Sequence, residues 1–234
     1  MRRHINIAMQ YYRQLNSHFG DLHWWPAKSP VEVVIGAVLI QNTNWSNVEK
    51  AIGNLDAFRC LNAEAILALP GHKLEQLIRP SGYFRLKAVR LRRVMEWYSR
   101  HEKVSPPPFR HVSDQTLREE LLDINGVGPE TADSLLLYAL NRPVFVVDTY
   151  TRRIARRHKL LDDAQCRDYH ELQKYFVEHV PREVAIYNQY HALIVATGKH
   201  FCGPKPKCAQ CPLRRYLPSG TSYRGLSKYA GEYP

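Results

Sequence analysis

The sequence Gly126-Val127-Gly128 lies between two segments with helical spacing, and it constrains the fold more than any other part of the chain. Glycine reaches the unusual backbone angles that a tight turn between helices needs. Pro129 suits the first turn of the following helix, where its missing N–H has no intrahelical acceptor. A stripe of apolar residues follows at helical spacing: Ala132, Leu135, Leu136, Ala139 and Leu140. We therefore expect a helix-hairpin-helix here.

Most of the remaining chain also has the spacing of helices. The apolar run 30–40 is short enough to be a strand, but it leads through a polar break into 47–52, which favours two helices. Further helices are expected over residues 61–69, 72–78, 86–97 and 114–122. Asp114 is the expected N-cap of the last one, and the three prolines in 105–108 predict a loop. The expected fold class is therefore all-α.

Basic residues outnumber acidic ones, with 33 Lys and Arg against 22 Asp and Glu and a formal charge of +11. This balance favours a polyanionic partner, either nucleic acid or an acidic membrane surface. No apolar run approaches the length of a membrane span, and the N-terminal segment lacks a long apolar stretch, so we expect neither a membrane protein nor a secretion signal. The five cysteines do not have the pattern of a disulfide framework. A cytoplasmic protein is the expectation.

The glycine hairpin is suited to holding one strand of DNA. Small residues let main-chain N–H groups approach a phosphate, and the N-terminus of the following helix is electropositive. The candidate contact residues are Gly126, Val127, Gly128 and Thr131. Such contacts fix position without reading sequence. An ordinary tight turn can have the same residues, so the hairpin alone leaves the function open.

The stretch 121–157 resembles the endonuclease III, or HhH-GPD, superfamily of base-excision DNA glycosylases. The resemblance rests on the hairpin, on Thr131-Ala132 and on Val146-Val147-Asp148-Thr149, and it extends more weakly over 21–213. It implies two helical domains with a cleft for DNA and the flipped base between them. We expect a six-helix domain over 29–141 that ends in the helix-hairpin-helix, a second helical domain from 1–28 plus 142–218 with a Cys-rich loop, and a loose tail over 219–234.

Asp148 matches the essential acid of that superfamily. Breaking an N-glycosidic bond builds positive charge on the sugar, and a fixed carboxylate stabilises that oxocarbenium-like state. The same carboxylate can orient or deprotonate the attacking water. Asp148 or Thr149 can also cap the following helix, and capping and catalysis are compatible roles.

Bifunctional members of the superfamily carry a lysine two residues after the second hairpin glycine, where this chain has Glu130. A carboxylate cannot form the imine through which that lysine cleaves the strand, so lysine-type lyase activity is not expected and water is the expected nucleophile. Glu130 is either a base-pocket residue or a surface acid that is favourable in the first turn of its helix.

The segment Trp24-Trp25-Pro26, together with Trp45, residues 79–84 and the acid at position 130, resembles the type III 3-methyladenine DNA glycosylases, a branch of the superfamily. In that branch the Trp-Trp-Pro segment and an aromatic residue at the place of Trp45 line the pocket for the flipped base. A base alkylated at a ring nitrogen is a cation, which an indole face attracts by roughly 0.5–2 kcal/mol. The alternative is that these tryptophans belong to the core.

Gln41 and Asn42 lie where members of the superfamily insert a polar side chain into the gap left by the flipped base. Flipping a base costs free energy, part of which such a plug offsets. A plain helix-breaking loop is the alternative for this segment.

Cys202, Cys208 and Cys211 resemble the [4Fe–4S] loop of endonuclease III, whose fourth cysteine falls at the place of Leu217 here. Such clusters usually have four thiolate ligands. A cluster, a zinc site with His200 as the fourth ligand, and a loop that has lost its metal all stay open. The glycosidic chemistry itself requires no cofactor.

The expected function is a monofunctional DNA glycosylase of base excision repair that hydrolyses alkylated purines, such as 3-methyladenine, from double-stranded DNA. A glycosylase for oxidised or mismatched bases and a non-catalytic helix-hairpin-helix DNA-binding protein are the alternatives. We expect a monomer without a membrane partner, acting on the nucleoid DNA of a bacterial cytoplasm. The histidines His158, His191 and His200 are scattered along the sequence and offer no distinct site.

Overall fold

A computed structural model describes residues 6–104 and 109–218, and every regular element in these ranges is helical. The all-α class is therefore confirmed. The loop expected over 105–108 and the tail expected over 219–234 lie outside the described residues. In the part of the chain that the structure describes, no helix is both long enough and apolar enough to cross a membrane.

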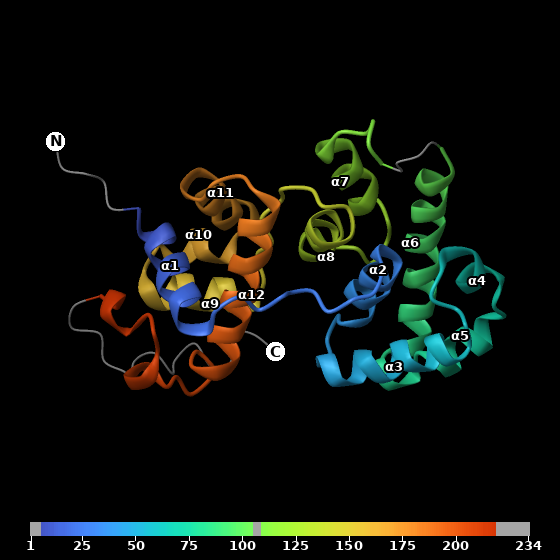
Figure 1. The fold of residues 1–234 in the computed structure, drawn as a ribbon, viewed down its shortest axis with the longest axis horizontal. Helices are drawn as coiled ribbons and strands as arrows, with labels where there is room; N and C mark the ends of the chain where they lie inside the picture. The colour runs from blue at the N-terminus through green and yellow to red at the C-terminus, as the bar shows by residue number, and fades with distance from the viewer. Residues whose placement is uncertain (1–5, 105–108, 219–234) are drawn as a thin grey trace. The chain divides into compact units, whose positions relative to one another are not determined.

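The chain divides into two compact units (Figure 1). Residues 25–142 form the continuous unit, and residues 1–24 together with 143–234 form the terminal unit. The sequence placed the corresponding boundaries at 29 and 141. In the terminal unit the first helix, α1 (Ile7–Phe19), packs on the last long helix, α12 (Val184–His200).

The continuous unit is built around α2, the helix formed by the ambiguous apolar run. Every residue of α2 after Pro30 is buried, because the helix packs between α3, α6 and the π-helical turn η2. A helix that is apolar all round is stable only when it is covered in this way. The elements of the unit are α2 (Pro30–Leu39), α3 (Trp45–Ala57), α4 (Ala63–Ala68), α5 (Gly71–Leu77), η1 (Arg79–Ser81), α6 (Phe84–Val104), α7 (Asp114–Leu122), α8 (Pro129–Ser134) and η2 (Leu135–Ala139).

Polar side chains determine where several of these helices begin. Three N-cap side chains accept hydrogen bonds from the backbone N–H three residues later: Ser29, Asn44 and Asn62. The expected N-cap of α7 was wrong by one residue. The Ser113 hydroxyl accepts from the Thr116 amide at 3.0 Å, and Asp114 takes the first helical position, where its carboxylate pairs with Arg142 at 3.1 Å.

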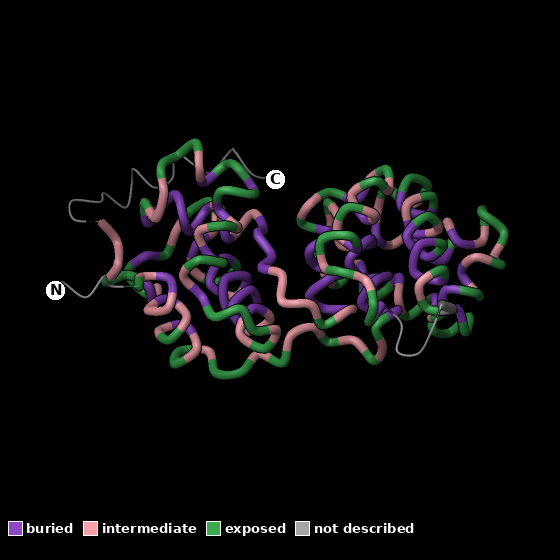
Figure 2. Tube along the Cα trace, turned by 90° about the horizontal axis from the view of Figure 1, so that it is seen from above, coloured by how far each residue is buried: buried purple, intermediate pink, exposed green. Residues whose placement is uncertain are grey.

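The terminal unit has an aromatic core. Phe145 stacks on Phe176 with ring centroids 4.5 Å apart and meets Tyr187 edge-on. The buried Tyr190 of α12 donates to the carbonyl of Ala8 in α1 at 2.7 Å, which fixes the N-terminal helix to the C-terminal part of the chain. Figure 2 shows the buried interior of each unit. The remaining elements are α9 (Thr149–His158), α10 (Asp163–Arg167), α11 (Tyr169–His179), η3 (Cys208–Gln210) and η4 (Arg214–Tyr216).

Candidate functional site

The hairpin between α7 and α8 contains one glycine in a left-handed conformation and one in open space. Gly126 has φ +94°, and a Cβ built there would clash with the side chain of Arg90, so both the backbone angle and the packing require glycine. Gly128 has φ −95°, and a Cβ built there would have no neighbour within 4 Å. Only one of the two glycines therefore needs the unusual angle that the sequence suggested for both. Because Gly128 is the N-cap of α8 and carries no side chain, the start of α8 has room for an anion.

The side chains of Val127 and Thr131 are buried inside the continuous unit. The Val127 amide donates to the Ile124 carbonyl at 2.9 Å and closes the turn. The Thr131 hydroxyl accepts from Gln41 Nε2 at 3.0 Å. These two residues shape the hairpin, so contact with DNA at this point would fall to the main chain.

Gln41 and Asn42 follow α2 directly but have different surroundings. The Gln41 amide nitrogen donates to the Gly126 carbonyl at 3.2 Å, and its oxygen accepts from Arg90 Nη1 at 2.8 Å. Asn42 is exposed and has φ +53°, a left-handed conformation that asparagine tolerates better than most residues. Gln41 therefore ties the turn after α2 to the hairpin, and Asn42 is the solvent-exposed residue of the pair.

Two of the expected base-pocket tryptophans belong to one aromatic cluster of the continuous unit. Trp25 meets Trp45 edge-on with centroids 5.2 Å apart, and it meets the tilted ring of Tyr138 from η2 at 5.1 Å. Gly36 of α2 makes room for this cluster, since a Cβ there would lie 3.2 Å from Trp25 Cζ2. The sequence did not single out Tyr138, because it lies within an apolar stripe.

Trp24, Pro26 and Glu130 are not part of this aromatic cluster. Trp24 belongs to the terminal unit, where the Lys199 ammonium lies 5.9 Å from its ring centroid. Pro26 is exposed. Glu130 is exposed in the first turn of α8, where a negative charge is favourable with the helix dipole.

Asp148 is buried at the start of α9, in the terminal unit. Its Oδ1 accepts hydrogen bonds from the Thr151 amide and the Thr151 hydroxyl, both at 2.7 Å, and the hydroxyl also accepts from the Asp148 amide at 3.4 Å. This reciprocal capping box fixes the carboxylate and confirms that Asp148 caps the helix. Only 7% of the residue is exposed. The capping box uses one carboxylate oxygen, Oδ1.

The other carboxylate oxygen of Asp148 faces His191 of α12. The distance from His191 Nε2 to Asp148 Oδ2 is 3.7 Å, and both side chains are buried. Burial lowers the pKa of His191, while the charge of Asp148 opposes that shift. The expectation that His191 has no distinct site is therefore corrected: α12 packs on α9 and brings it beside the candidate catalytic acid.

A glycine allows this close approach of α9 and α12. A Cβ on Gly198 would overlap the ring of Tyr150, the second residue of α9. Burial and the nearby charge of Asp148 together raise the pKa of Tyr150. Gly198 is thus needed for the packing that sets His191 opposite Asp148.

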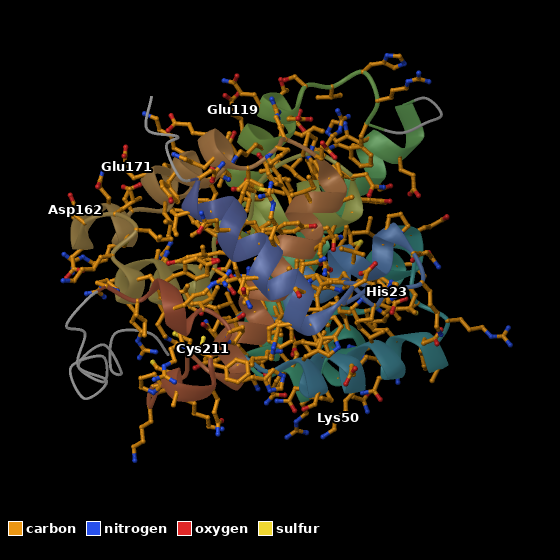
Figure 3. All side chains as sticks on the ribbon, turned by 60° about the vertical axis from the view of Figure 1, so that its left-hand side comes forward. His23, Lys50, Glu119, Asp162, Glu171 and Cys211 are labelled. Atoms are coloured by element: carbon orange, nitrogen blue, oxygen red, sulfur yellow. The ribbon has the colours of Figure 1, made fainter. Side chains whose placement is uncertain are left out.

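The three C-terminal cysteines line one small cavity, and Cys211 is labelled in Figure 3. Other lining residues are Arg157, His158, Phe201, Arg214 and Leu217. Burial raises the pKa of the Cys208 thiol. Burial also raises the pKa of the Cys211 thiol, to about 11. Leu217 places an apolar side chain where a fourth thiolate is expected. Among the described residues, no group of three or more His, Cys, Asp or Glu is arranged to hold a metal ion. The side chains therefore do not fit a four-thiolate cluster.

Arginine side chains from α9 hold this loop by its backbone. Arg157 Nη1 donates to the carbonyls of Cys202 at 3.1 Å and Gly203 at 2.8 Å, and it lies 3.1 Å from Cys202 Sγ. Arg153 Nη1 donates to the same Cys202 carbonyl at 3.1 Å. His200, the expected fourth zinc ligand, packs instead against the aromatic rings of Phe19 and Phe201.

Two residues at or just before the start of α6 have surroundings that their residue types do not indicate. Tyr83 has φ +44°, follows a left-handed Gly82, and is 70% exposed, which is unusual for a large aromatic side chain. Lys87 is 1% exposed, although a lysine in a basic helix is normally a surface residue. The resemblance already included Tyr83 within residues 79–84, whereas the sequence carries no signal that Lys87 is buried.

Comparison with known proteins identifies the family. Residues 35–182 match the HhH-GPD superfamily of base excision DNA repair proteins. The chain belongs to this superfamily, and it is a DNA glycosylase of the base excision repair type.

Similar proteins cover most of the chain. It is 44% identical over 213 residues to a candidate DNA repair glycosylase of Methanocaldococcus jannaschii, a match that covers 91% of this chain and 96% of the relative. It is 30% identical over 192 residues to endonuclease III of Thermotoga maritima, covering 80% and 82%.

Solved structures show the same likeness. The 3-methyladenine DNA glycosylase MagIII of H. pylori, bound to 1,N6-ethenoadenine, matches with a TM-score of 0.68 at 28% identity and covers 82% of this chain and 97% of that one. A trapped endonuclease III–DNA covalent intermediate, at 23% identity, has a TM-score of 0.75 over 92% and 96% of the two chains, which shows the shared fold. The resemblance to the superfamily and to its 3-methyladenine branch is confirmed.

Proposed function

We propose that this chain is a monofunctional DNA glycosylase that hydrolyses alkylated purines, such as 3-methyladenine, from double-stranded DNA. The observation that carries the proposal is the state of Asp148: a buried carboxylate that Thr151 holds by one oxygen, with the second oxygen outside the capping box. A fixed charge in such surroundings stabilises a developing positive charge more strongly than the same group does in water.

In the proposed reaction the base leaves with the electron pair of the glycosidic bond, and the sugar becomes an oxocarbenium-like cation. The Asp148 carboxylate stabilises this cation. Water then adds to C1′, and its proton passes to Asp148 or to solvent. An alkylated purine leaves readily because its ring already carries a positive charge, so strong protonation of the leaving group is not required.

The aromatic cluster of Trp25, Trp45 and Tyr138 supports the choice of a cationic base. Electron-rich ring faces attract a cation by roughly 0.5–2 kcal/mol and stack on any base. Trp24 and Pro26 are proposed as further pocket residues on the basis of the resemblance, together with Glu130. The solved H. pylori relative is a 3-methyladenine DNA glycosylase bound to 1,N6-ethenoadenine, which agrees with a modified adenine as substrate.

Hydrolysis without strand cleavage is proposed because position 130 carries a carboxylate. Glu130 cannot attack the sugar to form an imine. Lys87 does not replace the missing lysine, since it is buried and its ammonium donates to the carbonyls of Leu39 and Ser81. Water is therefore the proposed nucleophile.

Double-stranded DNA with a damaged base is the proposed partner of a monomeric enzyme. The main chain of the hairpin at Gly126, Val127 and Gly128 would hold a phosphate, and the exposed Asn42 would enter the gap left by the flipped base. Tyr83 offers an exposed ring for stacking on a neighbouring base. The net charge of +11 favours binding to the backbone at low salt.

No cofactor takes part in the proposed chemistry. The loop with Cys202, Cys208 and Cys211 is proposed to hold its shape through Arg153 and Arg157 rather than through a metal. The iron and zinc content of the purified protein tests this. A stoichiometric amount of either metal, lost when Cys208 is replaced by Ser, would contradict it.

A second candidate function is removal of oxidised or mismatched bases. The relative from Thermotoga maritima that favours it is an endonuclease III, 30% identical over 80% of this chain. This function would keep Asp148 and the hairpin but would not need a cation-attracting pocket.

The test is incubation of the protein with methylated duplex DNA and chromatography of the released bases, beside Asp148→Asn and duplexes that contain uracil, mismatched thymine or oxidised bases. Release of 3-methyladenine, lost in Asp148→Asn, supports the proposal. Borohydride reduces an imine between protein and DNA to a stable covalent product. Such a product would show lyase chemistry and would contradict the monofunctional assignment. Release from oxidised or mismatched substrates alone would favour the second candidate.

A further inference from the structure

Two basic side chains on α6, Lys87 and Arg90, contact residues within or directly before three separate turns of the continuous unit. These are the insertion turn (residues 40–44, after α2), the Tyr83 turn (residues 82–83, after η1) and the hairpin (residues 126–128). Each turn contains a left-handed residue: Asn42 at φ +53°, Gly82 at +70°, Tyr83 at +44° and Gly126 at +94°. Such conformations persist only where the surrounding structure holds them.

Lys87 joins the first two turns. Its ammonium donates to the Leu39 carbonyl at 2.8 Å, at the end of α2, and to the Ser81 carbonyl at 2.6 Å, at the end of η1. The side chain is 1% exposed, so these bonds replace hydration that the charge has lost. The carbonyls lie three residues before Asn42 and two before Tyr83, the exposed residues of the two turns. Lys87 therefore holds the residues that precede both turns at one point.

Arg90 joins the insertion turn to the hairpin. Its Nη1 donates to Gln41 Oε1 at 2.8 Å, and the Gln41 amide in turn donates to the Gly126 carbonyl and to Thr131. The stem of Arg90 also packs directly on Gly126, where no Cβ would fit. A displacement of the hairpin would therefore disturb its contacts with Arg90 and with Gln41 of the insertion turn.

We propose that Lys87 and Arg90 are positioning residues that brace the three turns into one rigid surface for DNA. The inference rests on the proposed function, in which the hairpin holds a phosphate and Asn42 enters the gap of the flipped base. With the brace intact, a phosphate bound at the hairpin determines where Asn42 and Tyr83 meet the duplex. Without the brace, the three turns move independently, and binding must offset the conformational entropy that is lost when they become ordered.

A purely structural role of the two side chains would lower the stability of the fold without a specific effect on damaged DNA. The distinction needs a ligand that engages only the hairpin and a ligand that engages all three turns. An undamaged duplex serves as the first, since it binds mainly through its backbone. A duplex with a tetrahydrofuran abasic analogue serves as the second, because the gap in the stack is already present.

The variants are Lys87→Met and Arg90→Met, which keep an unbranched side-chain stem and remove the hydrogen-bond donors. Arg93→Met is the matched control, because Arg93 lies exposed on the same helix and its replacement removes one positive charge. Dissociation constants are measured by fluorescence anisotropy at fixed salt, below the melting temperature of each variant. We expect all three variants to bind the undamaged duplex within about twofold of one another, since each loses one charge. Lys87→Met and Arg90→Met should bind the abasic duplex at least about tenfold more weakly than Arg93→Met does.

A double-mutant cycle between Arg90→Met and Gln41→Ala keeps the proposal testable if Lys87→Met does not fold. The brace predicts that the two losses of abasic-duplex affinity are not additive, because both variants break the same connection. Equal affinity of Arg90→Met and Arg93→Met for the abasic duplex, or additive losses in the cycle, would overturn the proposal. None of these affinity measurements depends on base release. Absence of activity on methylated DNA would therefore contradict the proposed substrate, while the binding measurements would still decide whether the brace exists.

Discussion

His191 Nε2 lies 3.7 Å from Oδ2 of Asp148, the carboxylate oxygen that the capping box does not use. The two side chains come from α12 and α9, and both are buried. Because burial lowers the pKa of His191, the imidazole is neutral near pH 7 and leaves the negative charge of Asp148 uncancelled. A neutral ring in this place can orient the carboxylate while the charge stays available for a developing cation.

Replacement of His191 by Phe is therefore expected to reduce single-turnover base release roughly tenfold or more, because a misplaced catalytic group loses much of its effect. His191→Gln should recover most of the rate, since the glutamine amide nitrogen can take the place of Nε2. Affinity for an abasic duplex should stay the same in both variants. Equal rates for His191→Phe and the unmodified protein would show that Asp148 needs no partner on α12.

The same pair predicts a pH dependence. A proton on His191 would pair with Asp148 and cancel its charge, and the pKa of His191 is lowered from its ordinary value of about 6.5. Base release is thus expected to be full at pH 7 and to fall only below about pH 6.5. His191→Gln has no such titration, so its rate should fall less over the same range. A parallel fall in both proteins would assign the acid limb to another group.

Asp148→Asn is expected to leave the fold intact and to lower base release on the order of a hundred- to ten-thousandfold. Asparagine is as good an N-cap as aspartate, so α9 should start in the same way. Its neutral amide, however, cannot stabilise the positive charge that develops on the sugar. Chromatographic release of 3-methyladenine measures the rate, and circular dichroism checks the helix content. A variant that stays active would remove Asp148 from the chemistry and leave it as a cap only.

The local features of this chain could be predicted because they depend on neighbouring residues. The hairpin, the proline at the start of α8 and the cap at Asp148 follow from residue types at fixed spacing, and all three occur in the structure. The apolar run 30–40 was harder, since periodicity does not separate a short strand from a buried helix. The polar break after it gave the correct interpretation.

The contacts between distant segments could not be predicted in this way. His191 lies opposite Asp148 only because α12 packs on α9, and no spacing in the sequence indicates that packing. Lys87 looks like a surface residue until its two carbonyl partners are known. Tyr138 joins Trp25 through the π-helical turn η2, which shifts the register that a regular helix would have.

Gly126→Ala and Gly128→Ala are expected to differ although the residues are two positions apart. Alanine at 126 would meet both a φ of +94° and the side chain of Arg90, so the free energy of unfolding should drop by roughly 1–3 kcal/mol. Alanine at 128 has an ordinary φ of −95° and open space, so stability should be almost unchanged. Its methyl group would, however, stand where a phosphate is proposed to bind. Urea unfolding and binding to an undamaged duplex measure the two effects, and equal stability of the variants would contradict the hairpin geometry.

Acid should destabilise the protein through His158, which joins α1 to the C-terminal loop. The Tyr11 hydroxyl lies 2.8 Å from His158 Nδ1, and burial lowers the pKa of His158 from 6.5 to about 4, although the Tyr216 backbone opposes the shift. Because the folded state resists the proton, the unfolded chain binds it first, and stability is full above pH 6.5 and is lost as the pH falls toward 4. The shift corresponds to roughly 3 kcal/mol at most. His158→Gln removes this titration, so the difference in unfolding free energy between pH 7 and pH 4.5 should be smaller in the variant than in the unmodified chain. Tyr11→Phe serves as the control, since it removes the hydroxyl and keeps the imidazole. An equal loss of stability in His158→Gln and the unmodified chain would place the acid sensitivity in other residues.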